Sequence, residues 1–168
     1  MKFTIFVERA FDDEVYNQLK EFIKKHTPNK VNLYCIAPVN YELIKSEQGY
    51  TGTKEELTRL MGERYDELKK MGCKINLHLH LSLRPDKLDL WHEGQMFKEA
   101  VEWMNECDFN PTEIMFGWYL YTSISLEIGK RYNLKLNKNK ERFHIHDYQL
   151  NNVYSLMNIL ANIRGLMR

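Results

Sequence analysis

Four of the six histidines in this chain form two His-x-His pairs, and each pair lies in a segment whose residues favour a β-strand. One pair is His78 and His80, and the other is His144 and His146. Side chains along a strand alternate between its two faces, so each pair presents both imidazoles to one face. Imidazole is the commonest metal-binding side chain and a frequent acid or base near neutral pH. The pairs predict one metal or acid–base site if their strands meet at one end of a sheet.

Carboxylates that could complete such a site lie close to both pairs in the expected fold. Glu8 closes the first predicted strand, and two imidazoles with one carboxylate suit Zn²⁺, Fe²⁺, Co²⁺ or Ni²⁺. Asp147 directly follows His146 and could assist it as a general acid. Neighbouring residues on a strand point apart, however, so a turn or helix-capping role is the simpler interpretation of Asp147. Asp12 and Asp13 are the alternatives to Glu8, although they are typical of a helix start.

Structural roles are the alternative for the other candidates too. Histidines on a strand can bond to backbone groups, and Glu8 can be an ordinary polar residue at a strand end. The residues Trp118, Tyr119 and Tyr121 form an aromatic cluster. Such a cluster can stack on a sugar or another ring, or it can fill the core. His144 is expected deeper on the same face as His146, in a supporting role.

Strands and helices are predicted to alternate along the whole chain. The strands are expected over 2–8, 31–36, 74–80, 112–117, 134–136 and 141–146, and the helices over 12–25, 53–71, 95–106, 122–132 and 149–166. Residues 40–52 are expected to form a polar and aromatic loop. This alternation predicts one α/β domain over 1–168 with a mainly parallel sheet. The polar candidates all lie at the carboxyl ends of their strands, where functional groups gather in such folds.

Net charge, apolar runs and cysteine content argue against several classes of function. The formal net charge of +1 offers no argument for binding nucleic acid or a membrane surface, and the basic stretch 135–142 is expected to be a solvated loop. No apolar run approaches the roughly 20 residues of a membrane span, and the N-terminus does not have the pattern of a secretory signal. We therefore expect a cytoplasmic protein. Its three cysteines, Cys35, Cys73 and Cys107, are expected to be reduced thiols that are mostly buried.

In the order of these motifs the chain resembles the polysaccharide deacetylase-like proteins, which are metal-dependent carbohydrate esterases. An acidic motif closes the first strand of that family, a histidine motif closes the third, an aromatic and glycine segment follows a middle strand, and a His-Asp motif precedes the last helix. The corresponding segments here are Glu8 (or Asp12-Asp13), His78-Leu-His80, Phe116-Gly-Trp-Tyr119 and Ile145-His-Asp147. The resemblance covers nearly the whole chain through short motifs. It implies an irregular, incomplete (β/α) barrel.

The resemblance also implies roles for individual residues. His78 and His80 would bind a divalent transition metal, expected to be zinc, and Glu8 would be a third ligand or the catalytic base. His146 would protonate the leaving group, while Trp118, Tyr119 and His144 would contact the substrate. The implied reaction removes an acetyl group, bound as an amide or ester, from a sugar or related small molecule.

Three departures from the family's pattern lead to a second expectation. The adjacent aspartates lie at a helix start, the two histidines are separated by one residue instead of two or three, and the arginine beside the aromatic segment is absent. A deacetylase-like domain that binds carbohydrate or a protein partner without catalysis is therefore the alternative. A metal-dependent phosphoesterase or amidohydrolase is the third, although those enzymes usually carry their His-x-His pair on the first strand. The sequence leaves the oligomeric state open.

Overall fold

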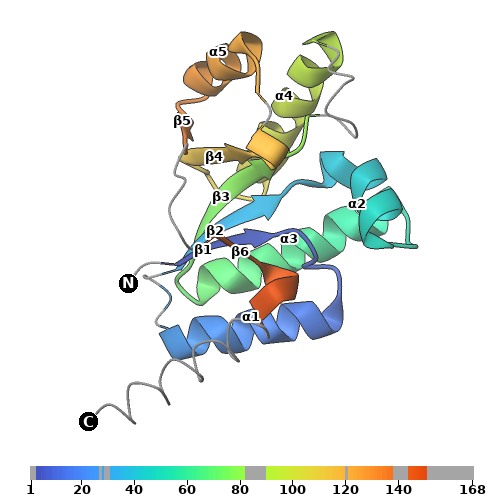
Figure 1. The fold of residues 1–168 in the computed structure, drawn as a ribbon, viewed down its shortest axis with the longest axis vertical. Coiled ribbons are helices and arrows are strands. Elements are labelled where there is room, and N and C mark those ends of the chain that lie inside the picture. Colours follow the sequence, from blue (N-terminus) through green and yellow to red (C-terminus); the bar gives the residue numbers. More distant parts are fainter. Residues whose placement is uncertain are drawn as a thin grey trace, which may run out of the picture.

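One sheet of six parallel strands organises the chain, in the order β5-β4-β3-β2-β1-β6 (Figure 1). The computed structural model describes residues 3–26, 28, 31–81, 90–119, 121–137 and 144–150. Its strands are β1 (Phe3–Val7), β2 (Val31–Ile36), β3 (Lys74–Leu79), β4 (Glu113–Phe116), β5 (Lys135–Leu136) and β6 (His144–His146). The prediction of an α/β protein with a mainly parallel sheet is confirmed.

Helices connect the successive strands from β1 to β5. They are α1 (Asp13–His26), α2 (Tyr41–Gln48), α3 (Lys54–Lys70), α4 (Leu90–Glu106) and α5 (Ser123–Arg131), with 3₁₀ turns η2 (Pro38–Asn40), η3 (Gly117–Tyr119) and η4 (Asp147–Gln149). The last predicted helix lies outside the described residues beyond Leu150. Each crossover from β1 to β5 moves one strand in the same direction across the sheet. Because parallel crossovers are almost always right-handed, this order predicts that the connecting helices cover one face.

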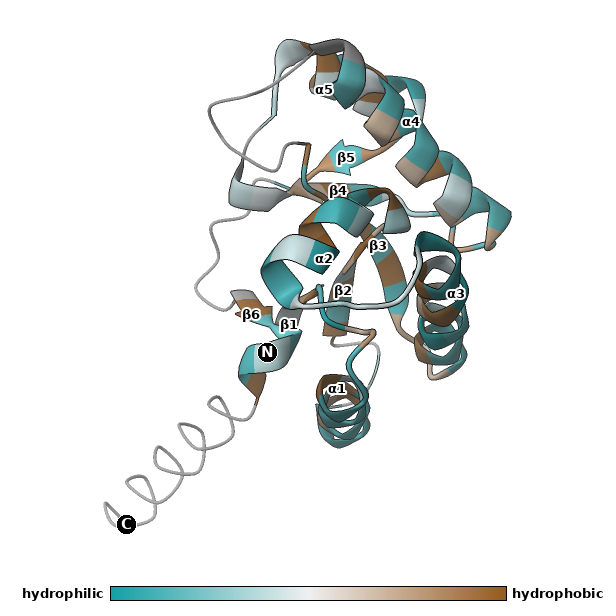
Figure 2. Ribbon diagram, turned by 90° about the vertical axis from the view of Figure 1, so that its right-hand side faces the viewer, coloured by the Kyte–Doolittle hydropathy of each residue, from teal (hydrophilic) through white to brown (hydrophobic). Residues whose placement is uncertain are grey.

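Burial along the strands agrees with that arrangement. The main core joins alternate strand residues, among them Ile5, Leu33 and Leu77, to the buried sides of the helices. Phe6, Tyr34 and Met115 form a separate cluster, since the intervening strand positions point to the opposite face. Figure 2 shows α1 and α3 carrying both hydrophobic and hydrophilic residues, as expected for helices that pack on one side only.

The sheet is not closed into a barrel among the described residues. Strands β5 and β6 are its two edges, and no pairing joins them. Strand β6 lies beside β1, so the last strand of the chain neighbours the first. This placement brings segments from both ends of the sequence to one part of the sheet.

One predicted loop is wrong. Residues 40–52 contain the helix α2, which buries Leu43 and Ile44 and ends at Gly49 in the left-handed conformation with φ 78°. Only two buried apolar residues form its inner side, too few for a helical repeat to be recognised. The helix α4 also begins five residues before its predicted start. By contrast, the predicted start of α3 is confirmed, because Thr53 and Glu56 form a reciprocal capping box.

Two smaller observations complete the fold. The cysteines are free thiols, with Cys35 and Cys73 buried and Cys107 partly buried, as expected. Of the helices that the structure describes, none is long and apolar enough to cross a membrane.

Candidate metal centre

The predicted site residues converge at the carboxyl end of the sheet. Glu8 directly follows β1, His78 lies in β3 and His80 directly follows β3. Val7 pairs with Cys35 and Ile36 pairs with His78, so Glu8 and His78 lie at the same level on either side of β2. Strand pairing thus brings together residues that are about 70 positions apart in the sequence.

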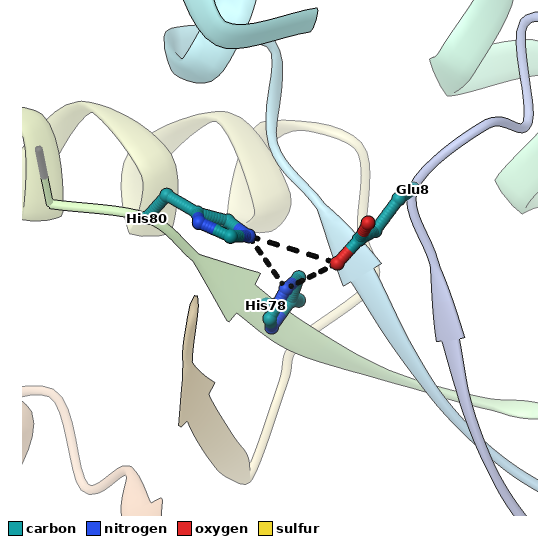
Figure 3. A group of neighbouring side chains, drawn as sticks. All are labelled: Glu8, His78 and His80. Atoms are coloured by element: carbon teal, nitrogen blue, oxygen red, sulfur yellow. Dashed lines mark hydrogen bonds and ion pairs between the residues drawn. The ribbon is translucent and has the colours of Figure 1, made fainter. Parts of the chain in front are cut away.

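The three side chains point toward one another, as Figure 3 shows. The Oε1 atom of Glu8 lies 3.0 Å from Nε2 of His78 and 3.6 Å from Nε2 of His80. The two Nε2 atoms lie 3.0 Å from each other. All three residues are buried, and their candidate ligand atoms lie within 4.8 Å of one another. The cluster could therefore hold a metal ion.

The hydrogen bonding of His78 determines which of its ring nitrogens presents a lone pair to the cluster. Its Nδ1 lies 3.0 Å from the carbonyl oxygen of Met115, which can only accept a hydrogen bond. The proton of the neutral ring therefore resides on Nδ1, and Nε2 presents a lone pair to Glu8. Burial lowers the pKa of His78, despite the opposing effect of Glu8, and so favours this neutral form.

His146 approaches the same carboxylate oxygen from β6. Its Nδ1 lies 3.4 Å from Glu8 Oε1, an ion-pair distance. Burial alone would lower the pKa of His146, but the close, negatively charged carboxylate of Glu8 outweighs it and raises that pKa. His146 is therefore biased toward the protonated form, unlike His78. The structure places it beside the three-residue cluster and outside the set of mutually close ligand atoms.

Glu8 is held as a carboxylate by these histidines. Burial would raise the pKa of Glu8, yet the close approach of the His146, His78 and His80 imidazoles lowers it well below its usual range. A buried carboxylate is stable only with such partners. The cluster thus keeps a negative charge within contact distance of three imidazoles.

Asn40 fixes the backbone at His80. Its Nδ2 donates to the His80 carbonyl oxygen at 2.6 Å, and its Oδ1 accepts from the His80 backbone N–H at 3.2 Å. Asn40 is buried in the 3₁₀ turn that follows β2. The sequence analysis missed this residue, although its position just after a strand end was a usable signal.

Replacement of Asn40 by alanine is expected to lower the free energy of unfolding by about 2 kcal/mol, because two buried backbone groups lose their partners. Urea denaturation of the metal-free protein would measure the change. Asn17→Ala is the matched control, since Asn17 is exposed on α1 and should tolerate alanine with little effect. Equal stability of the Asn40 and Asn17 variants would show that the Asn40 bonds do not fix this turn.

The aspartate alternatives lie outside the cluster. The Oδ1 atom of Asp12 accepts from the backbone N–H groups of Glu14 and Val15, so Asp12 caps α1. Asp13 is paired with Arg64 at the surface. Both residues therefore have the helix-start role that the sequence favoured over metal binding.

Asp147 also has a structural position. It is fully buried, and it accepts from the backbone N–H of Arg9 at 2.8 Å and of Tyr148 at 3.0 Å. Burial raises the pKa of Asp147 to about 7, against these backbone bonds, which lower it. Because Arg9 follows Glu8, Asp147 ties the segment after β1 to the turn after β6.

A cavity of about 610 Å³ opens beside the cluster, within the size range of small-molecule sites. Glu8, His78, His80 and His146 all line it, together with Trp118 and Tyr148. Trp118 and Tyr148 are 46% and 40% exposed, large values for aromatic residues. Trp118 meets the His80 ring edge to face, and Tyr148 stacks on His146.

Two predicted substrate residues are not tested by this geometry. The backbone of His144 pairs with Thr4 at the start of β6, but its side chain lies outside the described residues. The same holds for the side chain of Tyr119. Besides Trp118, the exposed aromatic residue Tyr148 lines the cavity, and the sequence analysis did not identify it.

Comparison with known proteins adds nothing to this geometry. The chain matches no family model, and no curated protein or solved structure is significantly similar to it. The function of the chain must therefore be inferred from the site itself.

Proposed function

We propose that this protein is a metal-dependent hydrolase that removes an acetyl group, bound as an amide or ester, from a sugar or related small molecule. The observation that carries the proposal is the meeting of a carboxylate oxygen and two imidazole Nε2 atoms in a buried cluster. With neutral His78, its lone pair faces the negative Oε1 of Glu8 at 3.0 Å. Such a contact is repulsive unless a proton or a cation lies between the atoms.

Zinc is the metal that we propose. Ligands at the usual zinc distances of about 2.0–2.1 Å in a tetrahedral site are about 3.3 Å apart. The three distances here are 3.0, 3.0 and 3.6 Å, which bracket that value. Three protein ligands also leave the fourth position that a catalytic zinc site requires.

The residues around the cluster supply the remaining chemistry. When bound, the metal would polarise the acetyl carbonyl and acidify a water molecule. Glu8 would hold the metal through Oε1, and its other carboxylate oxygen would be the base that accepts the proton of the attacking water. As the bond between the acetyl carbon and the leaving nitrogen or oxygen breaks, His146 donates a proton to the leaving atom. The raised pKa of His146 supports its role as the acid.

Hydrolysis of acetylated substrates by the zinc-loaded protein tests the proposal. We expect acetate release from N-acetylglucosamine oligomers or 4-nitrophenyl acetate that depends on added zinc. His146→Gln is expected to reduce kcat by about 10²–10⁴-fold, the usual contribution of a general acid, while zinc still binds. His92→Gln is the control, since His92 is exposed on α4. If sugars bind in the cavity without any turnover, the protein is instead a non-catalytic binding domain.

A further inference from the structure

Trp118 has an unfavourable backbone conformation, and its large apolar side chain is partly exposed. Its φ of 51° lies in the left-handed region, which residues with a Cβ atom rarely adopt. Its large apolar side chain is also 46% exposed. Strained residues persist where the surrounding structure imposes them, and they are concentrated at functional sites. Neighbouring groups must therefore impose the strained conformation of Trp118.

This conformation places the indole against a member of the candidate metal centre. The centroids of the Trp118 and His80 rings are 4.5 Å apart, and the rings are nearly perpendicular at 83°. The preceding residue, Gly117, packs its backbone closely on the same imidazole. Both residues belong to the turn η3 that follows β4, the strand next to β3.

His80 differs from His78 in how its ring is oriented. The second ring nitrogen of His78 bonds to the Met115 carbonyl. In His80 the second ring nitrogen, Nδ1, is buried and has no hydrogen-bond partner among the residues that the structure describes. Histidines that bind metals almost always have such a partner, and it sets the direction of the ring. In His80, the direction of the ring must therefore be set by contacts with neighbouring side chains and backbone.

We propose that Trp118 is a positioning residue for the metal centre, holding the His80 ring so that Nε2 points at Glu8 and His78. The indole and the backbone of Gly117 take the place of the missing hydrogen bond. The left-handed backbone of Trp118 is the conformation that brings the indole to the imidazole. This inference rests on the proposed metal site, and it concerns only the orientation of one ligand.

Trp118→Gly separates this role from an ordinary contribution to folding. Glycine adopts positive φ readily, so the variant should unfold at the same urea concentration as the wild type or a higher one. Its dissociation constant for zinc is nonetheless expected to rise about tenfold, the lower end of the effect of removing a group that orients a metal ligand. The visible absorption spectrum of the cobalt-substituted protein should change as well. Trp118→Phe, which keeps an aromatic ring, should restore zinc binding to within about threefold of the wild type.

Asn133→Gly is the matched control. Asn133 is exposed, has φ 56° and lies in the turn after α5, so glycine there relieves the same kind of strain away from the site. Its zinc affinity should equal that of the wild type. Trp118→Gly with wild-type zinc affinity and an unchanged cobalt spectrum would overturn the proposal.

A measurement on the metal-free protein distinguishes failure of this inference from failure of the proposed function. In the wild type, NMR should show a nuclear Overhauser contact between the His80 imidazole and the α-protons of Gly117. We expect Trp118→Gly to lose this contact and Trp118→Phe to keep it. Persistence of the contact in Trp118→Gly would contradict the positioning role, whether or not zinc binds. Absence of zinc binding in the wild type would contradict the proposed metal site and hydrolase, whereas the NMR contact tests by itself whether Trp118 orients the His80 ring.

Discussion

Alanine at both His78 and His80 is expected to abolish specific zinc binding, with a loss of affinity of at least about a thousandfold. The double variant retains only Glu8 of the three clustered ligands, and a single carboxylate cannot hold zinc selectively. Metal analysis of protein purified without chelator, and competition with a chelating dye, would measure the loss. This is the largest effect on zinc binding that we expect from substitutions at the site.

The control for this experiment must separate ligand loss from damage to the fold. His78 is buried and bonded to Met115, so its removal leaves a cavity and an unpaired carbonyl group. Circular dichroism and urea denaturation should show that the double variant still folds. His92→Ala removes an exposed histidine on α4 and should bind zinc like the wild type. One zinc ion bound tightly per molecule of the folded double variant would show that the cluster is not the metal site.

Gly117→Ala is expected to have the second largest effect on zinc affinity. A Cβ atom at Gly117 would lie within 3.0 Å of three atoms of the His80 ring, closer than real Cβ contacts come. Gly117 does not have a positive φ, so glycine is required there for space and not for backbone conformation. His80 must therefore turn away, and we expect zinc affinity to fall about 100-fold. Overpacking should also lower the free energy of unfolding by about 1–3 kcal/mol.

Gly62→Ala provides the comparison. Gly62 lies inside α3, and the nearest atom to its added Cβ would be Cys107 Sγ at an ordinary 3.9 Å. Because alanine favours a helix interior over glycine, this variant should be more stable by about 0.5–1 kcal/mol and bind zinc normally. If Gly117→Ala behaves like Gly62→Ala, the close packing of Gly117 against His80 does not control the site.

The candidate metal centre was only partly visible in the sequence. The spacing of His78 and His80 placed both imidazoles on one face, because alternation along a strand is a local property. Local signals also identified the start of α3 at Thr53 and the helix-capping role of Asp12. The helix α2 was missed, since its two buried apolar residues form too weak a pattern and its remaining burial depends on neighbouring elements.

The roles of the individual histidines depended on the tertiary structure. Only the sheet order places β6 beside β1 and so brings His146 to the carboxylate of Glu8. Only the contact between His78 and Met115 shows which nitrogen faces the cluster. Asn40 and Trp118 gain their significance from the position of His80, to which neither is close in the sequence.

The sequence by itself determined the α/β class, the shared face of His78 and His80 and the caps of two helices. These properties follow from interactions between residues a few positions apart. The tertiary structure decided that Glu8, His78 and His80 meet, that His146 lies beside them and that the described sheet stays open. Those outcomes depend on strand order and register, which are set by packing between distant segments. No local sequence pattern predicts them.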